Sequence, residues 1–229
     1  MDNKDLSLFS KGTFNPINKN FMFEGHEVLK QVEAVQRKYQ KDDTDTFINE
    51  LRDSIAGYTL GFNEVNVEKH GFDCKLSSNG EDYYLEVKSA SFMAKSWQAT
   101  FNDTTFEKAD AFKDEKVFLA LAVWQDASNL LFICFGQNKA IGEFLEEKIA
   151  WFKDGHTVRS TQSISLSTLV FKYGFKIIAV NKTKEEVRDI LREKSRAFNK
   201  LTPETLIDLK DYNAIKSVTK SPDKELELA

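Results

Sequence analysis

Residues 71–88 have the sequence Gly-Phe-Asp-Cys-Lys-Leu-Ser-Ser-Asn-Gly-Glu-Asp-Tyr-Tyr-Leu-Glu-Val-Lys, and this stretch decides how the middle of the chain folds. Asn79-Gly80 at its centre is a strong signal for a two-residue hairpin turn, because a type I′ turn needs a positive φ at both central residues. With these two residues as the turn, the register places Asp73 opposite Glu86. The stretch therefore predicts a β-hairpin in which two carboxylates face each other.

One face of this predicted hairpin is apolar and the other carries charge, because successive side chains of a strand point to opposite faces. The apolar face takes Phe72, Cys74, Leu76, Tyr83, Leu85 and Val87. The other face takes Asp73, Lys75, Tyr84, Glu86 and Lys88. The Cβ atoms of Asp73 and Glu86 would lie about 5 Å apart, and like charges in that position are destabilising. We expect Mg²⁺ to compensate them, since it binds one or two carboxylates together with waters and phosphate.

The remaining elements alternate between helices and strands along the chain. Helices are expected over residues 23–40, 47–57, 104–113, 138–152, 165–173, 183–200 and from 202 onward, with Thr104, Ser165 and Thr183 as N-terminal caps. Strands are expected over residues 58–68, 72–76, 82–89, 117–124, 130–135 and 175–180, and loops over 90–101 and 156–165. This order predicts an α/β protein, with a central mixed β-sheet flanked by helices in a single domain over residues 1–229.

The composition is that of a globular protein and excludes several classes of function. Of 229 residues, 41% are hydrophobic and 30% are charged, and the formal net charge is −4. The apolar runs are far shorter than the ~20 residues of a membrane-spanning helix, and we expect no signal peptide. The two cysteines, Cys74 and Cys134, do not have a metal-binding spacing, which indicates a reducing cytoplasm. The sequence has no glycine-rich phosphate loop, so no nucleotide cofactor is expected.

Gly-Phe-Asp73, followed by twelve residues and Glu86-Val-Lys88, resembles the motif of the PD-(D/E)XK nuclease superfamily. Phe72 stands where the motif usually has proline. The core order of that superfamily (helix, three strands, helix, strand) matches residues 44–125. The resemblance implies a restriction-endonuclease-like catalytic core over about 44–136, and a part for recognition and dimerisation over about 137–220.

The resemblance also implies roles for individual residues. Asp73 and Glu86 would bind Mg²⁺, and Lys88 would be the catalytic lysine. Many members add an acid from the helix before the sheet, for which Glu50 is the best match and Asp53, one turn later, is the alternative.

The resemblance implies that double-stranded DNA contacts the segment after the motif and a later polar segment. The residues expected to contact DNA are Lys95, Trp97, Gln98, Asn102, Arg159 and Gln162. Trp97 would either stack on DNA or pack in the core. Residues 151–184, which include the later segment, contain six basic residues and one acidic residue. Such a basic stretch is typical of a nucleic-acid-binding face.

A single domain without a helicase motor is most similar to a type II restriction endonuclease, which implies the cytoplasm of a prokaryote. A two-fold homodimer is expected, because it most simply cuts both strands of a symmetric site. Two alternatives stay open, namely a structure-selective or repair nuclease of the same superfamily and a DNA-binding module without catalytic activity. Two carboxylates about 5 Å apart also suit a retaining glycosidase, but the lysine after them and the small mixed sheet argue against it.

Overall fold

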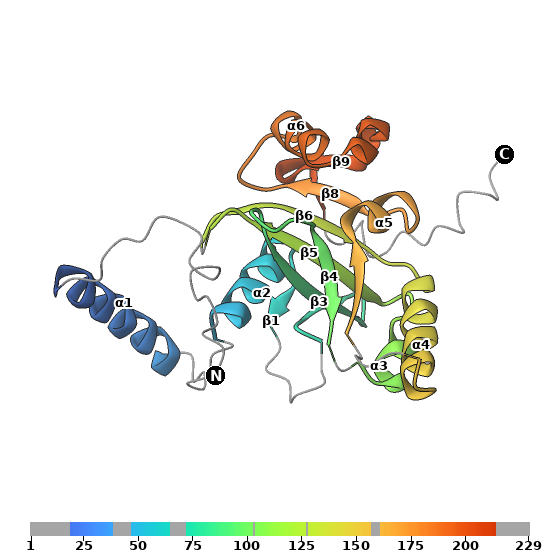
Figure 1. The fold of residues 1–229 in the computed structure, drawn as a ribbon, viewed down its shortest axis with the longest axis horizontal. Coiled ribbons are helices and arrows are strands. Elements are labelled where there is room, and N and C mark those ends of the chain that lie inside the picture. The colour runs from blue at the N-terminus through green and yellow to red at the C-terminus, as the bar shows by residue number, and fades with distance from the viewer. Residues whose placement is uncertain are drawn as a thin grey trace, which may run out of the picture. The chain divides into compact units, whose positions relative to one another are not determined.

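The computed structural model describes residues 19–38, 47–64, 72–102, 104–126, 128–156 and 161–213. The chain divides into two compact units, Met1–Phe47 and Ile48–Ala229. The described element of the first unit is the helix α1 (Lys19–Lys38). The expected catalytic core and the C-terminal part both fall almost entirely within the second unit, which carries the sheet (Figure 1).

A mixed sheet forms the centre of the second unit (Figure 1). Among the described residues it contains seven strands in the order β1-β2-β3-β5-β6-β8-β9. The strands are β1 (Asn63–Glu64), β2 (Cys74–Ser78), β3 (Glu81–Ser91), β5 (Val117–Trp124), β6 (Leu130–Gly136), β8 (Lys176–Ala179) and β9 (Leu206–Asp208). The pairs β3–β5 and β8–β9 are parallel, and the other neighbours are antiparallel. The prediction of an α/β protein with a central mixed sheet is confirmed.

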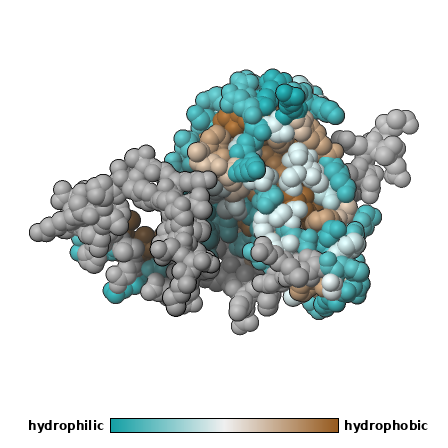
Figure 2. Space-filling model, in the orientation of Figure 1, coloured by the Kyte–Doolittle hydropathy of each residue, from teal (hydrophilic) through white to brown (hydrophobic). Residues whose placement is uncertain are grey.

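Helices and a short β-ribbon surround this sheet. The helices are α2 (Phe47–Thr59), α3 (Phe106–Ala111), α4 (Ala140–Lys153), α5 (Leu166–Phe171) and α6 (Lys184–Lys194). The β4–β7 ribbon pairs β4 (Gln98–Phe101) with β7 (Gln162–Ser165) in antiparallel fashion. Three short 3₁₀ helices lie near the C-terminal end, at Arg196–Lys200, Pro203–Thr205 and Leu209–Asp211. The space-filling view shows hydrophilic residues over the end of this unit that α6 forms (Figure 2).

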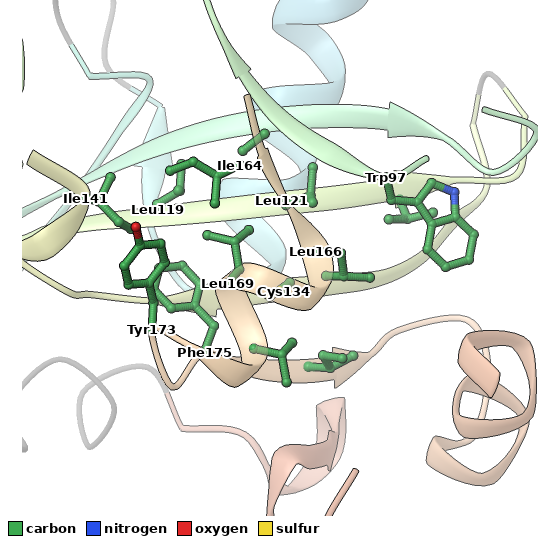
Figure 3. Close-up of a cluster of buried hydrophobic side chains, with 14 of the residues drawn as sticks. Trp97, Leu119, Leu121, Cys134, Ile141, Ile164, Leu166, Leu169, Tyr173 and Phe175 are labelled. Carbon is green, nitrogen blue, oxygen red and sulfur yellow. The ribbon is translucent and has the colours of Figure 1, made fainter. Parts of the chain in front are cut away.

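Two hydrophobic cores lie on opposite faces of the sheet, and β5 contributes to both. All eight residues of β5 are buried, as the uninterrupted apolar run predicted. Alternate residues from Val117 to Val123 belong to a core shared with α3, α4, α5, α6 and the ribbon. Phe118 and its alternates belong to a second core shared with α2. Figure 3 shows the first core, where Ile164 of the ribbon and Leu169 of α5 approach Leu121 of β5.

The hairpin has the predicted register and turn. Cys74 pairs with Leu85, and the pairing continues without a shift to the turn. Asn79 and Gly80 both have positive φ, of 53° and 80°, as a type I′ turn requires. Phe72 departs from the prediction, since its ring packs on Tyr84 and belongs to the first core. It precedes the first residue of β2, so the alternation of the strand does not extend to it.

Several predicted boundaries are wrong because local hydrogen bonds override the apolar pattern. The predicted strand over 58–68 is wrong at its start, since α2 continues to Thr59 and the chain turns at Gly61, whose φ is 82°. Only Asn63–Glu64 of that range forms a strand, and residues 65–71 lie outside the described residues. The helix over 104–113 is capped by Thr105 instead of Thr104, because the Thr105 side chain accepts from the N–H of Lys108.

Of the predictions for the C-terminal part of the chain, some are confirmed and one is wrong. The caps at Ser165 and Thr183 are confirmed, and Thr183 forms a complete capping box with Glu186. The helix expected from residue 202 is wrong. After Pro203–Thr205 the chain enters β9, whose Leu206 is buried and pairs with Ile177 of β8. Pairing with the sheet edge therefore prevails over continuation of the helix.

Gly57 was expected to end α2 but lies inside it, because the hairpin packs closely against the helix at this point. A Cβ at Gly57 would overlap Sγ of Cys74, which is fully buried. We expect Gly57→Ala to lower the free energy of unfolding by about 1–3 kcal/mol, as overpacking of a core does. Urea unfolding measures this change. In Gly57→Ala/Cys74→Ala the overlap is removed, so the two substitutions should be strongly non-additive, and additive losses would contradict the steric account.

No helix in the described part of the chain is long and apolar enough to cross a membrane. Both cysteines, Cys74 and Cys134, are buried, and neither forms a disulfide bond.

Candidate active site

The candidate site lies at the hairpin, where three elements bring ionisable side chains together. Asp73 directly precedes β2, and Glu86 and Lys88 lie on β3. Oδ2 of Asp73 accepts a hydrogen bond from the backbone N–H of Val87 at 2.7 Å, which ties Asp73 to the strand that carries Glu86 and Lys88. The register that Asn79-Gly80 predicted therefore extends far enough to bring these three side chains to one place.

Glu86 is the buried centre of the site, with 2% of its surface exposed. Nζ of Lys88 lies 2.6 Å from its Oε1. Nζ of Lys108, from α3, donates to Oε1 at 2.8 Å and lies 2.8 Å from Oε2 as well. Oε2 is nevertheless buried and accepts no hydrogen bond from the described residues. A buried carboxylate oxygen is costly unless another group binds it, and the ion pair with Lys108 is the contact that Oε2 has among the described residues.

Asp53 supplies a third carboxylate, from α2. Its Oδ1 accepts a hydrogen bond from the hydroxyl of Ser89, at 2.9 Å. Burial, and next the negative charge of Asp73, raise the pKa of Asp53 to about 7. Burial, and next the charge of Glu86, raise the pKa of Asp73 to about 6, although the N–H of Val87 acts in the opposite direction. The three acids are therefore close enough for each to oppose ionisation of its neighbours.

This arrangement selects Asp53 over Glu50 as the acid that α2 contributes. Asp53 interacts electrostatically with both hairpin acids, whereas Glu50 is exposed one turn earlier on the same helix. The position of each acid along α2 explains why Asp53 and not Glu50 is near the hairpin. The helix contacts the hairpin at Gly57, where Cys74 packs, and Asp53 lies one turn from Gly57 whereas Glu50 lies two turns away. The sequence allowed either residue, and only the packing of α2 on the hairpin distinguishes them.

Lys88 is held between the acids and the ribbon. Burial acts to lower the pKa of the Lys88 ammonium, but the charges of Glu86, Asp73 and Asp53 outweigh burial and raise it above its usual value. Its Nζ also lies 5.7 Å from the centroid of the Phe101 ring, at the end of β4. Lys88 is therefore a protonated ammonium in the metal-free protein, and it faces the carboxylates.

The residues expected to contact DNA are only partly brought together. Lys95, Gln98 and Asn102 are exposed on the segment that contains β4, and Gln162 is half-buried at the start of β7, paired with Phe101. Arg159 lies outside the described residues. The segments at 90–101 and 156–165 were predicted as loops, but each contributes a strand to the β4–β7 ribbon. Four-residue strands offer too few alternations to be recognised in sequence.

Trp97 is a residue of the first core, so its assignment to the DNA-contacting set is wrong. It is 3% exposed, and its indole N–H donates to the carbonyl of Phe92 at 3.2 Å. Its ring packs edge-on against Phe132, and Nζ of Lys194 lies 4.7 Å from its centroid. Figure 3 shows the indole beside the aliphatic cluster. A buried ring with its N–H satisfied is not available to stack on a base.

Two residues of the site were missed by sequence reasoning, namely Lys108 and Ser89. Lys108 comes from α3, about twenty residues after Glu86, and its side chain reaches from that helix to Glu86 on β3. The cap at Thr105 fixes where α3 begins, which places Lys108 in its first turn. The sequence did indicate a helix cap at this place, but at Thr104 instead of Thr105.

The chemistry of these side chains suits Mg²⁺. Asp73 and Glu86 offer hard carboxylate oxygens, and Oε2 of Glu86 lacks a hydrogen bond within the described residues. Over the same residues, no group of three or more His, Cys, Asp or Glu side chains is arranged to hold a metal ion by itself. A Mg²⁺ ion would therefore take two protein carboxylates and complete its shell with waters and a substrate phosphate, which is its usual mode of binding.

Comparison with models of known protein families gives no match, and no curated protein matches the chain in sequence.

The raised pKa values predict that the metal-free protein becomes less stable as pH rises from about 4 to about 7. Asp53 and Asp73 hold protons in the folded state that the unfolded chain, with a pKa near 3.8, has already lost. The folded state therefore binds more protons over this range, and stability falls with pH. Urea midpoints at pH 5 and pH 8 without divalent ions measure the effect.

Asp53→Asn should reduce this pH dependence, and Mg²⁺ should raise the urea midpoint more at pH 8 than at pH 5. Asp82→Asn is the matched control, because the pKa of Asp82 is lowered by its partner Lys75 and its titration lies below this range. A midpoint that rises from pH 5 to pH 8, or that depends on pH equally in both variants, would contradict the proximity of the three acids.

Proposed function

We propose that the protein is a Mg²⁺-dependent endonuclease that cleaves double-stranded DNA, and that it acts as a type II restriction enzyme. The observation that carries the proposal is the hairpin, in which Asp73 is hydrogen-bonded to the backbone N–H of Val87 and Lys88 is paired with the neighbouring Glu86. Their sequence pattern alone occurs in many proteins. Burial of Glu86 beside two ammonium groups, with a neighbouring acid whose pKa is raised, is typical of a functional site.

The fold supports the same proposal. The chain passes through α2, then β1, β2 and β3, then α3, and then β5. This is the order of helix, three strands, helix and strand that the resemblance to PD-(D/E)XK nucleases implies. β5 lies beside β3 and runs parallel to it. The candidate acids lie on the helix and hairpin of that order, as the resemblance also implies.

When bound, Mg²⁺ would polarise the phosphate and lower the pKa of the attacking water. Asp73 and Glu86 would hold it. In the hydrolysis, the water oxygen forms a bond to phosphorus and one phosphorus–oxygen ester bond breaks. The water gives up a proton, and the leaving oxygen takes one up. Lys88 would orient the water or stabilise the negative charge that develops on the phosphate, since its ammonium is fixed beside Glu86.

We propose the β4–β7 ribbon as the part that contacts DNA near the cleaved bond. The Phe101 ring at the end of β4 has its centroid 5.7 Å from Nζ of Lys88, so this end of the ribbon adjoins the candidate site. Gln98 is exposed on the ribbon, and glutamine pairs with adenine edges in the major groove. A two-stranded ribbon is narrow enough to enter that groove.

Incubation with phage DNA and Mg²⁺, followed by sequencing of the ends produced, tests this function. A type II restriction enzyme should give a small set of fixed sequences at the ends. Ends at random sequences, or ends only at junctions and lesions, would favour a structure-selective or repair nuclease instead. Band retardation of DNA without any new ends would indicate a binding module and would contradict the proposed catalysis.

We also propose that two copies of the chain act together. Both strands of a symmetric site are cut most simply by two catalytic centres, which a two-fold dimer supplies. Sedimentation should show a dimer, at the latest when DNA carrying the site is present. A monomer under both conditions would contradict the proposed dimer.

A further inference from the structure

We infer that Lys108 is a second catalytic lysine of this site, which Mg²⁺ displaces from Glu86 and which then contacts the phosphate to be cleaved. The inference rests on the proposed function. It differs from the role of Lys88, because Lys108 comes from α3 and lies outside the motif at Glu86-Val-Lys88.

The contacts of Lys108 are those of a counter-ion that can be replaced. Its Nζ lies 2.8 Å from both carboxylate oxygens of Glu86, yet only Oε1 accepts a hydrogen bond of good geometry. Oε2 is left buried and without a hydrogen bond among the described residues. Lys108 thus occupies the side of the carboxylate from which a cation would bind, and it meets Oε2 as an ion pair rather than through a hydrogen bond.

The surroundings of Lys108 allow its ammonium group to move while its backbone stays fixed. The Lys108 side chain is 20% exposed, whereas the side chain of Glu86 is 3% exposed. The Nζ of Lys108 lies 5.7 Å from the centroid of the Phe72 ring, and its backbone N–H is fixed by the Thr105 cap. A lysine that is fixed at its base, and whose side chain is partly exposed, can exchange one anionic partner for another nearby.

Charge balance supports this exchange. In the metal-free protein, the ammonium groups of Lys88 and Lys108 compensate three neighbouring carboxylates. Binding of Mg²⁺ to Asp73 and Glu86 adds two positive charges, which weakens the attraction of Glu86 for Lys108. The phosphodiester would be a ligand of the same Mg²⁺ ion as Glu86, so its negative charge would lie close to the carboxylate that Lys108 leaves. An ammonium that starts 2.8 Å from a metal ligand lies within reach of it.

The inference predicts an unusual pair of effects for Lys108→Met, which keeps the aliphatic stem but removes the charge. Mg²⁺ should saturate the variant at a concentration lower by on the order of tenfold, because a competing positive charge is gone. The turnover number at saturating Mg²⁺ should nevertheless fall by about a hundredfold, because one donor to the developing charge is lost. Loss of structure alone would not make the Mg²⁺ requirement smaller.

Cleavage of plasmid DNA over a range of Mg²⁺ concentrations measures both quantities. Lys108→Arg keeps the charge and should keep the Mg²⁺ dependence of the wild type, with part of the rate restored. Lys113→Met is the matched control, because Lys113 lies two residues after the end of α3 but pairs with Asp110 and Glu146. It should behave as the wild type. Lys108→Met with unchanged turnover, or with unchanged or weaker Mg²⁺ dependence, would overturn the inference.

A measurement on the wild-type protein covers the case in which Lys108→Met does not fold. Lysine labelling by an amine-reactive reagent, read by mass spectrometry, should increase at Lys108 when Mg²⁺ alone is added, and should stay constant at Lys113. Unchanged labelling at Lys108 would overturn the displacement. Absence of cleavage by the wild type would overturn the proposed function and the phosphate contact, whereas Mg²⁺-dependent labelling would still support displacement of Lys108 by the metal.

Discussion

Glu86→Gln is expected to lower the rate of Mg²⁺-dependent DNA cleavage by about a thousandfold. Glu86 would bind the metal and also holds both lysines of the site, Lys88 and Lys108. Removal of its charge therefore weakens metal binding and releases two groups that act on the phosphate. Single-turnover cleavage of a plasmid measures the rate.

The variant also leaves two ammonium groups beside a neutral side chain, so its stability must be measured together with its rate. Thermal unfolding should show that the protein is folded at the assay temperature, and band retardation without Mg²⁺ should show retained DNA binding. Asp82→Asn is the matched control, since Asp82 lies on the same strand but pairs with Lys75, away from Glu86. A folded Glu86→Gln protein that cleaves like Asp82→Asn would rule out this site.

Lys88→Met is expected to lower the turnover number by about 10²–10³-fold, with DNA affinity changed little. The ammonium of Lys88 is fixed by Oε1 of Glu86 at 2.6 Å, which is the position of a group that acts on the attacking water or on the phosphate. Loss of one such preorganised donor has an effect of this size. Single-turnover rates and band retardation measure turnover and affinity separately.

Lys75→Met is the control for this prediction. Lys75 lies on the adjacent strand β2, and its Nζ pairs with Asp82 at 2.7 Å. It should keep the wild-type rate. If Lys88→Met weakens DNA binding and leaves turnover unchanged, Lys88 is a binding residue and its catalytic role is wrong. Unlike Lys108→Met, Lys88→Met is not expected to separate Mg²⁺ affinity from turnover in opposite directions.

The parts of the fold that the sequence predicted well are those fixed by local chemistry. The positive φ at Asn79 and Gly80 fixes the turn, and the turn fixes the register as far as Cys74, the neighbour of Asp73. The strand over 117–124 was predicted to the residue, because only a strand covered on both faces accepts so long a run of apolar side chains. The capping box of Thr183 and Glu186 marked the start of α6, because its hydrogen bonds join residues only three positions apart.

The parts that were missed depend on contacts between distant segments. The β4–β7 ribbon pairs residues more than sixty positions apart, and each of its strands is too short to show a period. The choice of Asp53 over Glu50 depends on how α2 packs against the hairpin. The contact between Lys108 and Glu86 depends on the position of α3 beside β3. None of these follows from the pattern around any single residue.

Trp97 is an error of another kind, because a DNA contact was predicted for a residue that is buried in the core. An aromatic ring in a polar segment is equally suited to stacking on a base and to packing in a core. Here the ribbon carries it inward against Phe132, and the carbonyl of Phe92 satisfies its N–H. The exposed Gln98, the next residue in the chain, is the better candidate for DNA contact.

The measurement that tests the central claim most directly is cleavage of supercoiled plasmid by the wild type and by Asp73→Asn, with Mg²⁺ and with EDTA. Asparagine can still accept the hydrogen bond from the N–H of Val87, so this variant removes the charge and preserves the hairpin contact. We predict that the wild type linearises the plasmid with Mg²⁺ and not with EDTA, and that Asp73→Asn binds the plasmid without cutting it. Equal cleavage by both proteins, or cleavage that EDTA does not stop, would contradict the claim that these carboxylates form a Mg²⁺-dependent nuclease site.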